Sequence, residues 1–202
     1  MSKRDGSGKT NTEQRSLSNQ GRDGKAHFVT TSQLTKTALM LSLALVLSIL
    51  EAWLLPQGIL PIPGWKLGLA NIAILVTLYC VGPGEALAVA LLRSLLLLAF
   101  GGNIVGFSFS LVGGVAAWCS MFLLSKMQKV SIFGVSIGGA AMHAFGQILV
   151  ALFVTRTVYI VTYLPWLLAA SSTAGAVIAF LSIPVVKALD HFGNEMIQWK
   201  KQ

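Results

Sequence analysis

Acidic residues are scarce in this sequence, and aspartate is the rarest charged residue. The chain has 7 Asp and Glu residues against 15 Lys and Arg, and its three aspartates, Asp5, Asp23 and Asp190, lie outside the long apolar runs. A DDxxD-type pair that would hold magnesium and a diphosphate is therefore absent. The GxSxG, HExxH and P-loop patterns are missing as well, so no catalytic constellation is predicted and any ATPase must be another chain.

Cysteine is also rare, which bears on metal binding. Cys80 and Cys119 lie in apolar segments without CxxC spacing or a neighbouring histidine. We interpret both as buried small apolar residues, and we expect no metal site and no cofactor. The net charge of +8 is compatible with nucleic acid binding in principle. The basic residues stand at the ends of apolar runs, however, where membrane proteins place them, so we expect no nucleic acid partner.

Apolar residues are abundant. Hydrophobic residues make up 54% of the chain and charged residues 11%, and the mean hydropathy is +0.73. Soluble domains do not have this composition, so the sequence predicts an all-α, polytopic membrane protein. We expect a disordered basic cytoplasmic tail over 1–34, one transmembrane domain over 35–190 and a short cytoplasmic tail over 191–202.

Hydropathy and helix-breaking residues divide the transmembrane domain into six candidate spans. Each is close to the roughly 17–25 residues that a bilayer crossing requires. The breaks fall at Pro56 to Gly64, Gly82-Pro83-Gly84, Gly101-Gly102-Asn103, Lys126 to Ser131 and the stretch before Pro165. The predicted spans are 37–55, 67–82, 84–100, 105–126, 134–155 and 165–187.

The distribution of basic residues predicts the orientation. With both termini in the cytoplasm, Lys66 and Arg156 are the basic residues of the outer side, and Arg93 lies within the membrane. All the other Lys and Arg residues then fall on the cytoplasmic side, as the positive-inside rule requires. We therefore expect a multi-pass protein of the bacterial inner membrane with its N- and C-termini in the cytoplasm.

Polar residues inside the apolar runs are the best indication of function. A charged side chain at membrane depth costs a few kcal/mol or more, so it usually faces a partner, a cavity or a ligand. A rise of about 1.5 Å per residue places most of these residues in the outer half of the bundle. We expect a pocket open to the outside, with two tryptophans near its mouth; the predicted ligand-binding residues are Glu51, Trp65, Asn71, Arg93, His143, Gln147 and Trp166.

Each of these polar residues also has a structural interpretation. Glu51 and Arg93 have matching depths and can neutralise one another as an ion pair, or Glu51 can reach the outer interface. His143 can bridge helices, and Asn71 can cap a helix or bind a neighbouring one. Small residues recur at four-residue spacing, as in Ala44-Ser48-Ala52 and Gly106-Ser110-Gly114. These stripes favour close helix packing, or docking of another membrane subunit on the first helix.

Three sequence stretches resemble one membrane protein family. They are Lys66-Leu-Gly-Leu-Ala-Asn-Ile-Ala-Ile-Leu, then Gly82-Pro-Gly-Glu-Ala with Leu91-Leu-Arg93, and Gly134 to Gln147. They resemble the Gx transporter family, which is also known as heptaprenyl diphosphate synthase component I. The resemblance covers about residues 37–188.

That family is similar in turn to the S components of energy-coupling-factor vitamin importers. The similarity implies a six-helix bundle that binds a substrate and works with a membrane coupling subunit and ATPases. In those importers small residues on the first helix dock the coupling subunit, and the nearest counterparts here are Ala38, Ser42, Ala44 and Ser48.

Three hypotheses for the function follow. The first is a transporter subunit that binds a small vitamin-like or quinone-precursor molecule; in it Arg93 holds an anionic group of the ligand. The second is a membrane accessory subunit of a heptaprenyl or polyprenyl diphosphate synthase in isoprenoid or menaquinone biosynthesis. The third is a structural membrane scaffold, which would tolerate loss of the buried polar residues except through folding.

Overall fold

The computed structural model describes residues 31–54 and 68–192. The chain divides into two units, Met1–Leu34 and Thr35–Gln202, and the description below concerns the second unit. The predicted tails lie outside the described residues up to residue 30 and from residue 193 onward.

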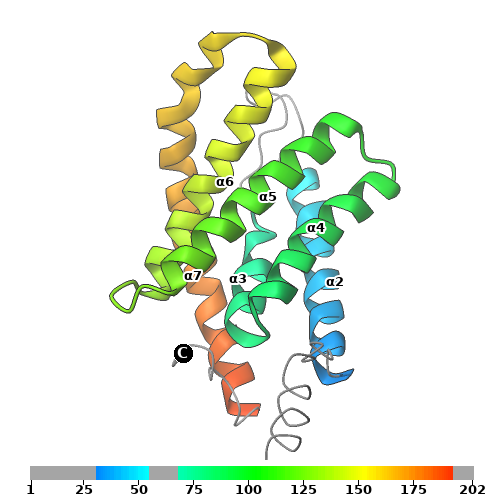
Figure 1. The fold of residues 1–202 in the computed structure, drawn as a ribbon, viewed down its shortest axis with the longest axis vertical. Coiled ribbons are helices and arrows are strands. Elements are labelled where there is room, and N and C mark those ends of the chain that lie inside the picture. The colour runs from blue at the N-terminus through cyan, green and yellow to red at the C-terminus, as the bar shows by residue number, and fades with distance from the viewer. Residues whose placement is uncertain (1–30, 55–67, 193–202) are drawn as a thin grey trace, which may run out of the picture. The chain divides into compact units, whose positions relative to one another are not determined.

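Every regular element in the described part of the chain is helical, which confirms the predicted fold class (Figure 1). The helices occur in the order expected for six successive spans. Their bounds are α2 Thr31–Leu54, α3 Asn71–Cys80, α4 Pro83–Ala99, α5 Ile104–Ser125, α6 Ile132–Thr155, the 3₁₀ helix η1 Val158–Tyr163, and α7 Leu164–Phe192.

The helices begin and end at the residues that local chemistry favours. Pro83 stands in the first turn of α4, where a missing N–H costs nothing. The Asn103 side chain caps α5 by accepting a hydrogen bond from the Gly106 N–H at 2.6 Å, and Ser131 caps α6 in the same way at Gly134, at 3.3 Å. Helix α6 ends at Thr155, and Arg156, which follows it, is left-handed with φ of 52°.

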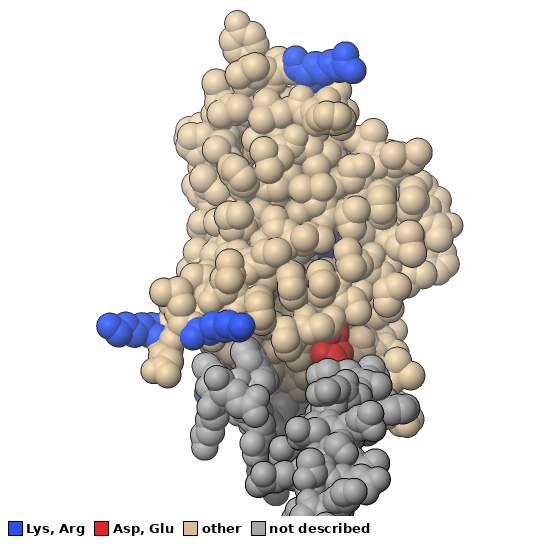
Figure 2. Space-filling model, in the orientation of Figure 1, with Lys and Arg blue, Asp and Glu red and all other residues tan. Residues whose placement is uncertain are grey.

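Four helical segments are long and apolar enough to cross a membrane by themselves. They are Thr31–Trp53, Ile104–Ser125, Ile132–Thr155 and Val158–Lys187. The exposed surface of these helices is largely apolar, as lipid contact requires. In Figure 2 the Lys and Arg side chains lie at two ends of the displayed face, and uncharged residues cover most of the area between them.

Helix α3 differs from its prediction. The predicted span 67–82 would cross the bilayer, but the helix has 10 residues and is about 15 Å long. Gly68 turns the backbone before it with φ of 80°, a conformation that favours glycine. Every residue of α3 except Cys80 is buried, and the helix contacts α4, α5, α6 and α7. Its apolar sequence therefore reflects burial among helices on all sides.

One core cluster surrounds α3, and a second joins α5, α6, η1 and α7. Glycines bring the helices close together at two crossings. A Cβ on Gly146 would lie 3.0 Å from the Val112 carbonyl oxygen of α5, and one on Gly175 would lie 3.1 Å from the Ser136 carbonyl oxygen of α6. The Ser136 hydroxyl also donates to the Gly175 carbonyl at 2.7 Å. Small residues thus set the α5–α6 and α6–α7 distances.

Candidate functional site

The five polar residues predicted within the spans are all buried in the helical bundle. They come from four helices, α2, α3, α4 and α6. Their exposed fractions are 2% for Glu51, 0% for Asn71, 3% for Arg93, 3% for His143 and 2% for Gln147.

Glu51 connects α2 to the residue from which α3 starts. Its Oε1 atom accepts a hydrogen bond from the Gly68 N–H at 2.6 Å. A hydrogen bond to a carboxylate is stronger than one between neutral groups. Glu51 therefore holds the positive-φ turn that leads into α3, and its charge stays inside the bundle.

Asn71 and His143 meet at the same glycine. A Cβ on Gly68 would lie 2.8 Å from Asn71 Nδ2 and 3.5 Å from His143 Cδ2. The Asn71 carboxamide is fully buried, yet neither Nδ2 nor Oδ1 has a hydrogen-bond partner among the described residues. A buried amide without partners is costly and marks a place where a ligand or water would fit.

His143 and Gln147 are neighbours on one face of α6. Gln147 Nε2 lies 3.1 Å from His143 Nε2, and the ring packs on Gly113 of α5, where a Cβ would lie 2.9 Å from His143 Cε1. Because the amide nitrogen donates, His143 Nε2 accepts in this pair. The Gln147 Oε1 atom is buried without a described partner.

Arg93 is held by serines from two other helices. Its Nη1 donates to Ser48 Oγ of α2 at 3.4 Å, and its Nη2 donates to Ser110 Oγ of α5 at 3.2 Å. The Nε atom has no described partner. Gly114 leaves room for the guanidinium, because a Cβ there would lie 3.3 Å from Nη2.

Glu51 and Arg93 act on one another, and Arg93 also has hydrogen-bond partners on other helices. Glu51 acts electrostatically on Arg93 inside the bundle, as their matching depth predicts. The described hydrogen bonds of the guanidinium nevertheless go to Ser48 and Ser110. The two charges thus lie in one cluster, and the guanidinium Nε–H has no hydrogen-bond partner among the described residues.

Sequence reasoning missed the serines around Arg93. Ser48 and Ser110 fall in stripes of small residues, which indicate packing, and Ser94 attracted no attention. Ser48 donates to the Ala44 carbonyl at 2.8 Å, and the Ser94 and Ser110 hydroxyls are 3.0 Å apart. A sequence signal did exist, since Ser94 follows the one arginine within the spans.

Of the two predicted tryptophans, only Trp166 falls among the described residues, and it does not join the buried cluster. Trp65 lies outside the described residues. Trp166, near the start of α7, is 78% exposed. An exposed tryptophan suits the membrane interface, where an apolar ring with a polar N–H is favoured.

The four predicted docking residues do not share one face of α2. Ala38 and Ser42 are exposed, and the Ser42 hydroxyl donates to the Ala38 carbonyl of its own helix at 3.0 Å. Ala44 and Ser48 are buried in the bundle. A partner on the surface of α2 would therefore contact the first pair and not the second.

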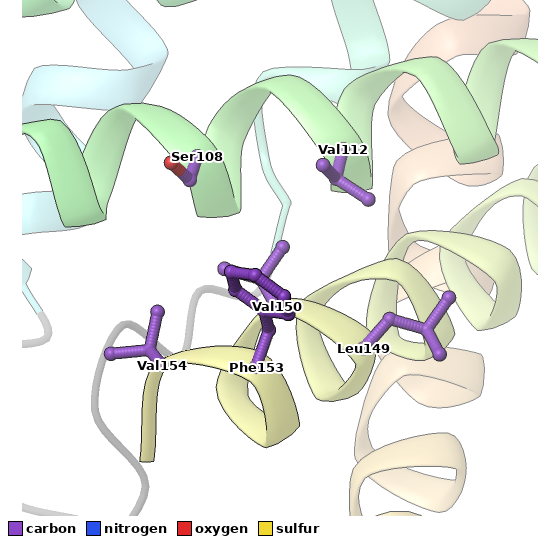
Figure 3. Close-up of a pocket in the computed structure, with 6 residues that line it drawn as sticks. All are labelled: Ser108, Val112, Leu149, Val150, Phe153 and Val154. Atoms are coloured by element: carbon purple, nitrogen blue, oxygen red, sulfur yellow. The ribbon is translucent and has the colours of Figure 1, made fainter. Parts of the chain in front are cut away.

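An apolar groove of about 410 Å³ lies between α5 and α6 (Figure 3). It is lined by Ser108, Val112, Leu149, Val150, Phe153 and Val154. None of the predicted ligand-binding residues lines it, and its Ser108 hydroxyl is already bonded to the Ile104 carbonyl at 2.9 Å. The groove is separate from the polar cluster. Within the described residues no group of three or more His, Cys, Asp or Glu is placed to hold a metal ion.

The helical bundle defines the class of protein. The fold is similar to a solved S component of a bacterial ECF transporter, with a TM-score of 0.63 and 20% identity over 80% of this chain and 96% of that chain. The chain is thus a multi-pass helical membrane protein with the S-component fold, as predicted.

The family model described as heptaprenyl diphosphate synthase component I matches residues 40–184, so the chain belongs to that family. This confirms the resemblance inferred from the sequence. No curated protein matches the chain.

Proposed function

We propose that this protein is the substrate-binding subunit of a membrane transporter. It binds a small vitamin-like or quinone-precursor molecule in a pocket that faces the outside of the cell. Glu51, Asn71, Arg93, His143 and Gln147 form this pocket, and Trp65 and Trp166 lie near its mouth. The protein itself catalyses no reaction.

The observation that carries this proposal is the set of buried polar atoms without partners. Both polar atoms of Asn71, the Nε of Arg93 and the Oε1 of Gln147 lack hydrogen bonds to described residues. In a bilayer each unsatisfied polar group costs several kcal/mol, which is roughly the free energy of transferring that group from water into hydrocarbon. Four such atoms in one cluster are better explained by a ligand than by helix packing.

The fold supports the same proposal. A solved structure with a similar fold is the S component of a bacterial ECF transporter. We therefore place the energy source in other chains, a coupling subunit and its ATPases. Ala38 and Ser42 are candidates for the contact with that subunit, because they are exposed on α2.

The location and orientation belong to the same proposal. The protein resides in the bacterial inner membrane with both termini in the cytoplasm. The outer ends of the helices then include the α6–η1 junction at Arg156, and the inner side includes the basic turn of Lys126 and Lys129 between α5 and α6. This orientation opens the polar cluster toward the outside.

The family name favours a second candidate function. The family is described as component I of a heptaprenyl diphosphate synthase, so the chain could anchor a synthase and hold its lipid product. The apolar groove between α5 and α6 is the described feature that suits a lipid chain. Any diphosphate chemistry would have to come from the partner, because the chain has no DDxxD motif.

Mass spectrometry of the purified protein separates the two candidates. The protein is extracted in mild detergent, and both the small molecules and the proteins that remain bound are identified. The transporter proposal predicts a reproducible water-soluble compound, with or without a coupling subunit and ATPases. Co-purification of an aspartate-rich synthase with a bound polyprenyl compound would support the second candidate and contradict the first.

A further inference from the structure

We infer that the pocket is built for a monocarboxylate whose other end is a neutral group with both a hydrogen-bond donor and an acceptor. This inference rests on the proposed function and specifies its ligand. It also excludes diphosphates from this pocket, although the family name would favour them.

The anionic end of the ligand is assigned to Arg93. The side chain is 3% exposed, and its two Nη atoms are oriented by Ser48 and Ser110 from different helices. The Nε–H, which has no described partner, lies on the edge of the guanidinium that binds carboxylates side-on. Neutral serine partners fix the position of the guanidinium without neutralising its charge.

The charge balance favours one negative charge on the ligand over two or three. Arg93 is the buried cation of the described residues, and the Glu51 carboxylate acts on it within the same cluster. The pair carries no net charge, so one carboxylate, held by the Arg93 edge, leaves a single negative charge in the cluster. A phosphate or diphosphate would add two or three, and uncompensated buried charge is strongly unfavourable at membrane depth.

The neutral end of the ligand is assigned to Asn71 and Gln147. With respect to the described residues, Asn71 has an unused donor and an unused acceptor, and Gln147 has an unused acceptor. An amide, lactam or similar group supplies the complementary set. Both side chains are neutral amides, so neither would compensate an ionic group at this end.

Two adjacent glycines of α5 bring the two ends together. Gly113 contacts the His143 ring, and Gly114 contacts the Arg93 guanidinium. Consecutive Cα atoms are about 3.8 Å apart. The anion site and the amide site therefore flank the same turn of α5.

The experiment uses a methanol extract of bacterial metabolites as the probe. The full-length protein in nanodiscs is stripped of bound molecules, incubated with the extract and washed, and the captured compounds are analysed by tandem mass spectrometry. The inference predicts a captured compound that loses carbon dioxide on fragmentation and gives no phosphate ions. Arg93→Gln should reduce its capture by at least about 10-fold, the effect of losing a charged hydrogen bond.

Three further variants keep the experiment informative if Arg93→Gln misfolds. Arg93→Lys keeps the charge but lacks the planar edge, so we expect reduced capture. Ser110→Ala loosens the guanidinium and should weaken capture of the carboxylate. Lys129→Gln removes an exposed charge outside the cluster and should leave capture unchanged.

The outcomes distinguish this inference from the proposed function. Capture of a neutral or phosphorylated compound would overturn the monocarboxylate inference while supporting the transporter proposal. Equal capture of a carboxylate by the wild type and all three cluster variants would also overturn it. If the wild type captures no water-soluble compound at all, the proposed function itself fails.

Discussion

Asn71 is the first residue of α3; its side chain is fully buried, and no described residue is a hydrogen-bond partner of its two polar atoms. If Asn71 served only helix packing, an apolar residue at this position would give a more stable protein. The sequence predicted that Asn71 is important, because an amide in an apolar run is costly. It did not reveal whether a neighbouring helix satisfies the amide, since that depends on side chains more than twenty residues away.

Replacing Asn71 by leucine therefore separates stability from binding. Asn71→Leu removes two unsatisfied atoms at similar volume, so we expect the ligand-free protein to gain about 1–3 kcal/mol of unfolding free energy. Capture of the small molecule should fall at the same time. Chemical denaturation in detergent and the capture assay measure the two effects, and a loss of stability with unchanged capture would contradict the ligand role.

Gly113 is predicted to be essential for the position of His143. An alanine Cβ would lie 2.9 Å from His143 Cε1, so Gly113→Ala should displace the ring and destabilise the protein by about 1–3 kcal/mol. Gly84→Ala in α4 is the matched control, because nothing lies within 4 Å of its Cβ position. The control should be neutral or stabilising by up to about 1 kcal/mol. Equal thermal unfolding of both variants would argue against tight packing at Gly113.

The serine partners of Arg93 show the limit of residue-level prediction. Serines in apolar helices commonly donate to a carbonyl one turn earlier, as Ser48 and Ser94 do, and they are then indistinguishable from packing residues. Their second contacts, to Arg93 and to Ser110, exist only after the helices pack. The charge of Arg93 was visible in the sequence, but its orientation was not.

At the scale of helices, the ends of α5 and α6 were predictable from the sequence, whereas the length of α3 was not. Asn103 and Ser131 cap α5 and α6 where breaks were expected. Hydropathy gave a full span over 67–82, whereas α3 begins only at Asn71. The cause is the positive φ of Gly68, together with burial of α3 on all sides, because a completely buried short helix is as apolar as a membrane span.

The α5–α6 crossing gives a prediction at this scale. Gly146→Ala would place a methyl group 3.0 Å from backbone atoms of Val112 and Gly113, and backbone cannot yield as a side chain can. We expect a loss of about 1–3 kcal/mol in unfolding free energy. Gly84→Ala in α4 is the control, because nothing lies within 4 Å of its Cβ position. If both variants unfold alike, the crossing is looser than described.

The whole molecule has a predicted orientation in the membrane. Single cysteines introduced into a variant lacking Cys80 and Cys119 can be labelled with a membrane-impermeant maleimide in intact cells. Thr157→Cys, beyond the end of α6, should be labelled from outside. Gln128→Cys, between α5 and α6, should be labelled only after permeabilisation, because positive loops stay inside. The reverse pattern would contradict the outward-facing pocket.

The class of protein was also readable from the sequence at this scale, whereas the ligand was not. Composition and hydropathy determine that the chain enters a membrane. The motifs around Asn71 and Arg93 indicated the family, which the match of the family model to residues 40–184 confirms. The ligand depends on a few polar atoms and their directions. Those directions follow from helix packing, which no local pattern encodes.

Native mass spectrometry of the protein released from nanodiscs tests the central claim most directly. The wild type, exposed to the metabolite extract, should carry one bound small molecule per chain, and Arg93→Gln should appear without it while remaining folded. A wild-type mass that corresponds to the chain alone, or to the chain with phospholipids only, would contradict the claim that the buried polar cluster is a ligand site.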